Sequence, residues 1–139
     1  MIRKATIRIE SAIADSIMAN MGNLTAGATY MVEAYYYVRE QGLREIRAMF
    51  TLPELKLMLD AENGVAFSPS LITGFPGHIY DAMSLDRLDR KWGVDRDALM
   101  KKLNDLPLST MIVLEEWLNY YWYGRLGERP PIEKYLTGE

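Results

Sequence analysis

A short alternating stretch at residues 2–9 precedes a chain whose other patterns all have helical spacing. Its apolar residues lie on one side of an extended backbone and its polar residues on the other: Ala5, Ile7 and Ile9 against Lys4, Thr6 and Arg8. This alternation predicts a β-strand with one buried face. A lone strand leaves its backbone donors and acceptors without partners. We therefore expect it to pair with the same strand of a second copy, antiparallel across a two-fold axis.

The remaining apolar residues recur every three to four positions, which predicts amphipathic helices. Six helices are predicted, over residues 11–21, 26–41 (or as far as 49), 51–63, 78–91, 95–103 and 109–124. The predicted caps are Thr25, the capping box of Thr51 and Glu54, Asp95 and Ser109. Residues 64–77 form the main linker, and the tail that contains Pro130 and Pro131 is expected to be loose.

Residues 2–41 resemble a ribbon-helix-helix DNA-binding domain, through the strand Lys4–Ile9 and the loop Gly22–Gly27 between two helices. The resemblance implies that a two-stranded intermolecular ribbon enters the major groove of DNA. It implies base reading by Lys4, Thr6 and Arg8, and phosphate binding by Asn23, Leu24 and Thr25 at a helix N-terminus, helped by Arg3. The expected dimer core contains Ala5, Ile7, Ile9, Ile13, Ile17, Met31, Ala34, Tyr35 and Val38.

The expected fold is therefore mainly α, with an N-terminal ribbon-helix-helix followed by a helical C-terminal region. Residues 1–50 would form the dimerisation and DNA-binding domain, and residues 51–139 an oligomerisation or effector region. This second region is loosely similar to phage- and prophage-associated proteins.

The distribution of charge changes what the net charge of −3 implies. Taken alone, an acidic total argues against a nucleic-acid partner, because phosphates need a basic surface. The first nine residues, however, contain three basic side chains and no acid, and a dimer would bring two such segments together. Residues 10–38 contain no Lys or Arg, so the basic surface is confined to the predicted ribbon.

The absence of cysteine and the single histidine, His78, exclude many kinds of site. Without cysteine there is no disulfide framework, no thiolate metal site and no cysteine nucleophile. One histidine makes a histidine-based zinc site in one chain improbable. His78 is interpreted as structural or superficial, with a general base or ligand as the alternative. We expect no metal, no cofactor and no enzymatic activity.

Three further patterns have a functional and a structural interpretation. Residues 85–103 have helix-turn-helix spacing, but Asp95 as a helix cap favours a plain helical hairpin. The aromatic runs 35–37 and 120–123 would stack on bases or divide between core and interface, and the second interpretation is favoured. Glu115 and Glu116, with Asp86 and Asp89, would hold a divalent cation or form solvated helix faces, and again the second is favoured.

The function predicted from these observations is sequence-specific DNA binding by a dimeric transcriptional regulator. The expected partners are DNA and a second copy of the chain, with a tetramer as the alternative and a protein or small molecule as effector. The main rival is a protein-interaction or assembly module, of an antitoxin-like or phage accessory kind, without strong DNA binding. An enzyme built around His78 is a second rival.

No signal peptide or membrane span is indicated, because the longest uncharged run, residues 63–80, contains three Gly and two Pro. A cytoplasmic location is expected.

Overall fold

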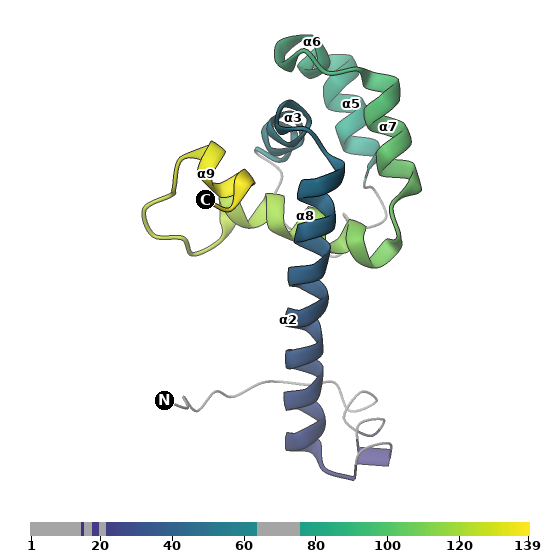
Figure 1. Cartoon of the computed structure of the whole chain (residues 1–139), viewed down its shortest axis with the longest axis vertical. Coiled ribbons are helices and arrows are strands. Elements are labelled where there is room, and N and C mark those ends of the chain that lie inside the picture. Colours follow the sequence, from purple (N-terminus) through teal and green to yellow (C-terminus); the bar gives the residue numbers. More distant parts are fainter. Residues whose placement is uncertain (1–14, 16–17, 20–21, 64–75) are drawn as a thin grey trace. The chain divides into compact units, whose positions relative to one another are not determined.

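The computed structural model describes residues 15, 18–19, 22–63 and 76–139, and every regular element in these ranges is a helix (Figure 1). The helices are α2 (Leu24–Met49), α3 (Leu52–Glu62), α5 (Gly77–Leu85), α6 (Leu88–Trp92), α7 (Arg96–Asp105), α8 (Leu108–Tyr123) and α9 (Ile132–Thr137). The chain divides into two compact units, Met1–Val38 and Arg39–Glu139, with the boundary inside α2.

The described residues are mainly helical, but the predicted ribbon-helix-helix class is wrong for this structure. No strand and no ribbon occurs among the described residues, and residues 2–9 lie outside them. In the described residues the backbone groups are paired within helices, of which α2, with 26 residues from Leu24 to Met49, is the longest.

Helix α2 passes Gly42 without a break because this glycine lies at a close crossing of two helices. A Cβ atom at Gly42 would lie 3.3 Å from the Cγ1 atom of Val113 in α8. The missing side chain therefore lets the two helices approach closely. The residues that follow, Leu43 and Ile46, are 5% and 0% exposed, and this packing offsets the low helix propensity of glycine.

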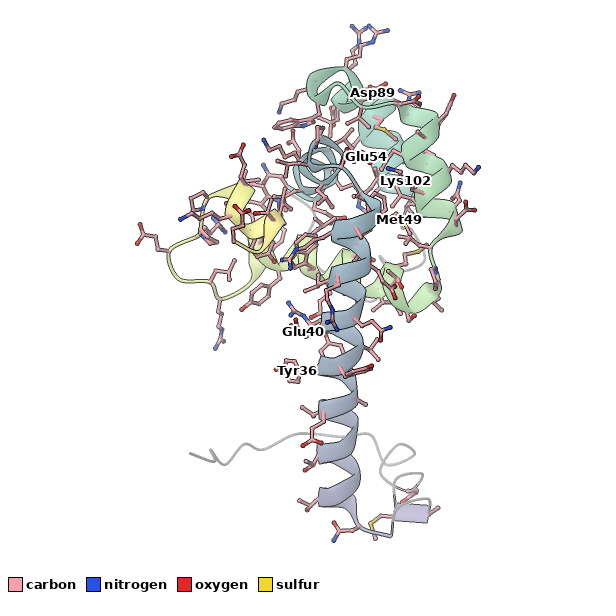
Figure 2. All side chains as sticks on the ribbon, in the orientation of Figure 1. Tyr36, Glu40, Met49, Glu54, Asp89 and Lys102 are labelled. Atoms are coloured by element: carbon pink, nitrogen blue, oxygen red, sulfur yellow. The ribbon has the colours of Figure 1, made fainter. Side chains whose placement is uncertain are left out.

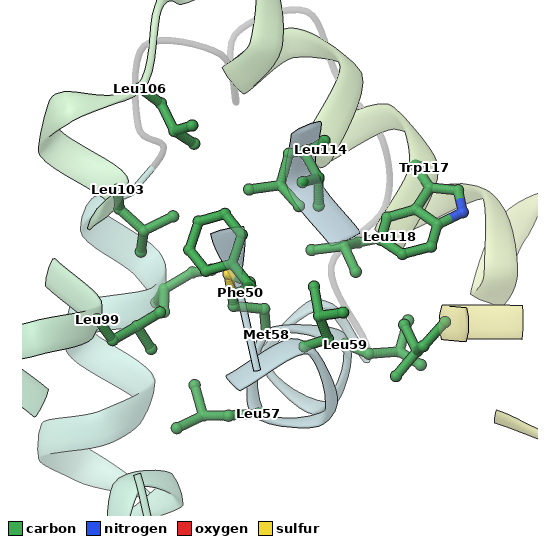
Figure 3. Close-up of a cluster of buried hydrophobic side chains, with 14 of the residues drawn as sticks. Phe50, Leu57, Met58, Leu59, Leu99, Leu103, Leu106, Leu114, Trp117 and Leu118 are labelled. Carbon is green, nitrogen blue, oxygen red and sulfur yellow. The ribbon is translucent and has the colours of Figure 1, made fainter. Parts of the chain in front are cut away.

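Helix α3 forms the centre of the second unit and packs against α5, α6, α8 and α9. It is buried on several sides, and its core residues are Leu55, Leu57, Met58 and Leu59. Figure 3 shows Leu57, Met58 and Leu59 among apolar side chains of α7 and α8. The predicted capping box is confirmed: the amide of Thr51 donates to Glu54 Oε1 at 2.8 Å, and the amide of Glu54 donates to Thr51 Oγ1 at 3.3 Å.

The prediction of one continuous helix over residues 78–91 is wrong, because the chain forms two helices there, α5 and α6. Arg87 between them has a φ of 55°, in the left-handed region, which ends α5. Gly93 then ends α6 in the same conformation.

The predicted cap of α7 is confirmed, since the amide of Ala98 donates to Asp95 Oδ1 at 3.1 Å. Leu85 is the first leucine of the helix-turn-helix spacing. It is 81% exposed, so it does not pack in a core between two helices as that spacing requires.

Two predictions about the C-terminal part are wrong. Ser109 does not cap α8, which begins one residue earlier, after Pro107, with no side-chain cap. The tail is not loose, because it folds into α9, whose Leu136 is fully buried. The connection to α9 is held by hydrogen bonds to the end of α8: Tyr121 Oη donates to the Pro130 carbonyl at 2.9 Å, and Arg129 Nε to the Tyr121 carbonyl at 2.8 Å.

Candidate functional site

An apolar stripe follows α2 along most of its length and changes from exposed to buried. We call Ala28, Val32, Tyr35 and Tyr36 the exposed stripe, and Gly42, Leu43 and Ile46 the buried stripe. Along the sequence, steps of three to four residues connect the two sets through Arg39. The large members of the exposed stripe are 41–58% exposed, whereas Leu43 and Ile46 are almost completely buried. Figure 2 shows Tyr36 pointing away from α2.

The exposed stripe is nearly free of charge. Between Leu24 and Val38 the only charged side chain is Glu33. The rings of Tyr35 and Tyr36 meet edge to face, with their centroids 5.8 Å apart. Such a pair offers a large, stiff apolar area together with two hydroxyl groups, and aromatic residues of this kind are enriched at protein interfaces.

The predicted DNA-contacting residues are only partly visible. Those of the predicted strand, with Arg3, lie outside the described residues, as do Ile13 and Ile17 of the predicted dimer core. Asn23 and Thr25 are exposed at the start of α2, where the amide of Gly27 donates to the Asn23 carbonyl at 3.0 Å. Leu24 begins the same helix. Whether these groups bind phosphate stays a prediction.

The rest of the predicted dimer core lies on α2. Ala34 is half-buried, while Tyr35 and Val38 are 41% and 45% exposed. Met31 lies on the same helix. The second aromatic run, in α8, divides as predicted: Tyr121 is buried, whereas Tyr120 and Tyr123 are exposed. The first run, Tyr35–Tyr37, lies entirely at the surface.

A buried charge cluster in the second unit connects α3, α5 and α8. His78 Nε2 lies 2.5 Å from Glu62 Oε1, and the Glu62 side chain is fully buried. Glu115, on α8, is 2% exposed and interacts electrostatically with both. Burial alone would lower the pKa of His78, but the hydrogen bond from Glu62 and the charges of Glu62, Glu115 and Asp81 outweigh it and raise this pKa above 6.5.

The same cluster also raises the pKa of Glu115. Burial is the main cause and the charge of Glu62 adds to it, while His78 opposes both. Among the described residues, Glu62 Oε2 and Glu115 Oε1 are buried without a hydrogen-bond partner. In the same residues no three His, Asp or Glu side chains are arranged to hold a metal ion. With Glu62 closed off from solvent, the cluster serves to hold three helices together.

The sequence analysis treated His78 as isolated and missed Glu62 and the buried position of Glu115. The sequence contains a signal for the burial of each of these two acids. Glu62 continues the stripe of Leu55, Met58 and Leu59 at the next helical position, where an acid is unusual. Glu115 precedes the buried Leu118 by three residues on α8. What the spacing does not show is that these two acids meet His78.

Comparison with known protein families, curated proteins and solved structures finds no match to this chain. Within the described residues, no helix has both the length and the apolar character needed to cross a bilayer. The function is therefore argued from the geometry of the chain itself. The exposed stripe is accessible to a partner, whereas Glu62 of the charge cluster is not.

Proposed function

We propose that this chain is a protein-interaction module that assembles as a homodimer through the exposed stripe of α2. The observation that supports the proposal is the continuity of the stripe. In the second unit its positions are buried by α8 and the rest of the core, and before Arg39 the same positions hold large apolar residues that are about half exposed. A contiguous exposed apolar surface of this kind is typical of interaction sites.

A second copy of the chain is the partner that the stripe fits best. Its large residues, Tyr35 and Tyr36, lie toward the C-terminal end, and its small residue Ala28, with the neighbouring Thr29, toward the N-terminal end. An antiparallel pair centred on Val32 would place Ala28 opposite Tyr36 and Thr29 opposite Tyr35. Small residues would then face large ones across a two-fold axis, which is the self-complementarity that such an interface requires. The near absence of charge means that two copies do not repel each other.

The test compares two tyrosines on opposite sides of the same helix. Tyr35→Glu places a charge in the exposed stripe, whereas Tyr37→Glu places the same charge two residues further along, about 200° around the helix. Tyr37 is the more exposed of the two, at 67% against 41%. Sedimentation velocity should show a dimer for the wild-type chain and for Tyr37→Glu, and a monomer for Tyr35→Glu. A wild-type chain that is monomeric at high concentration would refute the proposal.

The orientation of the pair has a separate test, because the chain has no cysteine of its own. In an antiparallel pair, Val32→Cys should form a disulfide with its own copy under mild oxidation. Ala28→Cys and Tyr36→Cys should each fail to do so alone and should crosslink when mixed, since a disulfide needs its Cα atoms within roughly 7 Å. Rapid crosslinking of Ala28→Cys with itself would instead indicate a parallel pair and would leave the dimer itself intact.

DNA binding is a second candidate, favoured by the three basic side chains that precede the first acid in the sequence. A dimer has two copies of Arg3, Lys4 and Arg8, six positive charges in all. Fluorescence anisotropy with a random duplex should show binding at low salt and a steep loss as salt rises. Arg8→Ala should weaken it, and Arg125→Ala, an exposed arginine of the second unit, should not. No binding at low salt would leave an assembly module without a DNA partner.

A further inference from the structure

An open cavity of about 410 Å³ lies in the second unit, beside the C-terminal half of α2, α8 and α9. Its volume falls within the range of roughly 300–1,000 Å³ that is usual for small-molecule sites. Three cationic side chains line it: Arg39 and Arg47 from α2, two turns apart, and Lys134 from α9. Aromatic side chains form much of the wall: Trp117, Tyr120 and Tyr135.

The guanidinium group of Arg47 is held in a fixed position. Its Nε donates to the Leu136 carbonyl at 3.0 Å and its Nη2 to the Tyr135 carbonyl at 3.4 Å. The group also lies over the ring of Trp117, 5.3 Å from the centroid. Its Nη1 atom takes part in neither of these hydrogen bonds. A guanidinium fixed in this way presents donors to a ligand at little cost in side-chain entropy.

Arg39 has only loose partners. Its closest carboxylate oxygens, from Glu40 and Glu116, lie 3.7 and 4.0 Å away, at the outer limit of an ion pair. Both arginines also act on the hydroxyl of Tyr135. Burial raises the pKa of Tyr135, and the charges of Arg39 and Arg47 partly oppose that effect. The neutral hydroxyl donates to the Trp117 carbonyl at 2.5 Å.

We infer that this cavity binds a small organic molecule through a phosphate or carboxylate group, held by Arg39 and Arg47. Planar guanidinium groups bind such oxyanions with paired hydrogen bonds, and Lys134 adds a third positive charge. Two exposed acids, Glu40 and Glu139, also line the cavity, so its three cationic side chains exceed its acidic ones by one. None of the residues of the exposed stripe lines the cavity, and the inference goes beyond the assembly function.

The test is an NMR titration of the ¹⁵N-labelled chain with inorganic phosphate in one arm and citrate in the other. Sodium chloride holds the ionic strength constant, so that screening does not mimic binding. The indole signal of Trp117 and the guanidinium signals of Arg39 and Arg47 should shift and saturate. Arg39→Gln should raise the dissociation constant at least tenfold, about the effect of losing a hydrogen bond to a charged group. The arm that saturates identifies the oxyanion.

Arg44→Gln is the matched control, since Arg44 is exposed on the same helix and does not line the cavity. The dissociation constant of Arg44→Gln for the bound anion should equal that of the wild-type chain. If Arg39→Gln alters the fold by circular dichroism, the exposed Lys134 provides a second variant, Lys134→Gln, which should weaken binding severalfold. The inference is overturned if neither anion saturates the signals, or if Arg39→Gln and Arg44→Gln weaken binding equally.

Discussion

The two halves of α2 have the same pattern but different surroundings. In residues 39–49 the apolar stripe is buried, with Leu43 and Ile46 at 5% and 0% exposed. In residues 24–38 the same positions contain Val32 and Tyr35, at 43% and 41%. The helix itself continues across the boundary without a break. One half is therefore stabilised by its own chain, and the other has an apolar surface that its own chain leaves half exposed.

This difference indicates where a partner is needed. Burying one Leu or Ile side chain contributes about 1.5–3 kcal/mol, and the buried half of α2 gains this from α8 and the core. The exposed half cannot rely on helix propensity instead, since Tyr35, Tyr36, Tyr37 and Val38 are mediocre helix formers. A second copy would supply the missing contacts, so the two halves should respond differently to the same substitutions.

The largest expected difference is between Ile46→Ala and Val32→Ala. Ile46 is fully buried, so its truncation should lower the free energy of unfolding by about 2–4 kcal/mol, through lost apolar contact and a residual cavity. Val32→Ala should change the unfolding of the monomer by less than about 0.5 kcal/mol, as for other surface changes. Urea unfolding at low protein concentration measures both values, and equal losses would show that the halves are not distinct.

The next difference concerns pH and the buried charge cluster. The pKa values of His78 and Glu115 are both raised in the folded chain, so the folded state binds protons more tightly than the unfolded state. Their stabilisation is complete below the unfolded pKa values and is lost as pH rises through the folded ones. The free energy of unfolding should therefore fall as pH rises above about 4.5, through Glu115, and further above about 6.5, through His78.

His78→Gln should remove most of the histidine contribution to this slope. At about pH 6 it should cost about 2 kcal/mol, because Glu62 loses a charged hydrogen-bond partner inside the core. The cost should shrink toward high pH. Dimerisation through the exposed stripe should not follow the same curve, since Glu33 is the only charged residue between Leu24 and Val38. Urea unfolding and sedimentation over one pH series separate the two, and parallel curves would contradict the assignment.

The parts of the fold that the sequence predicts correctly depend on neighbouring residues. The face of α8 formed by Val113, Leu114, Trp117, Leu118 and Tyr121 is buried as its spacing predicts. The capping box at Thr51 and the Asp95 cap are also confirmed. Each pattern is complete within a few residues, so no knowledge of the rest of the chain is needed.

The parts that it predicts wrongly depend on distant residues. The tail folds into α9 because Arg47, almost ninety residues earlier, donates to its carbonyls. Arg87 adopts a left-handed conformation that no local pattern indicates for an arginine. The predicted ribbon does not occur among the described residues, and its strand, residues 2–9, lies outside them. Glu62 and His78 meet only after α3 and α5 have packed together.

A smaller effect tests how far the buried half of α2 depends on α9. Gly138 ends α9 with a φ of 78°, and a Cβ atom there would lie 2.7 Å from Nη1 of Arg47. Gly138→Ala should cost about 1 kcal/mol, because the left-handed conformation disfavours a side chain and Arg47 must shift. Hydrogen exchange should become faster in residues 39–49 and stay unchanged in residues 24–38. Faster exchange in both halves would show that α9 supports the whole helix.

The smallest expected effect comes from Arg87, which provides a control for the whole comparison. Its φ of 55° is costly for a residue with a side chain, and Arg87→Gly relieves that cost while making the unfolded chain more flexible. The net result should be a stabilisation of about 0.5 kcal/mol, measured by urea unfolding. Because Arg87 lies on neither stripe, the dimer dissociation constant should not change. A change in dimerisation would mean that the stability of the second unit alone controls how the exposed half behaves.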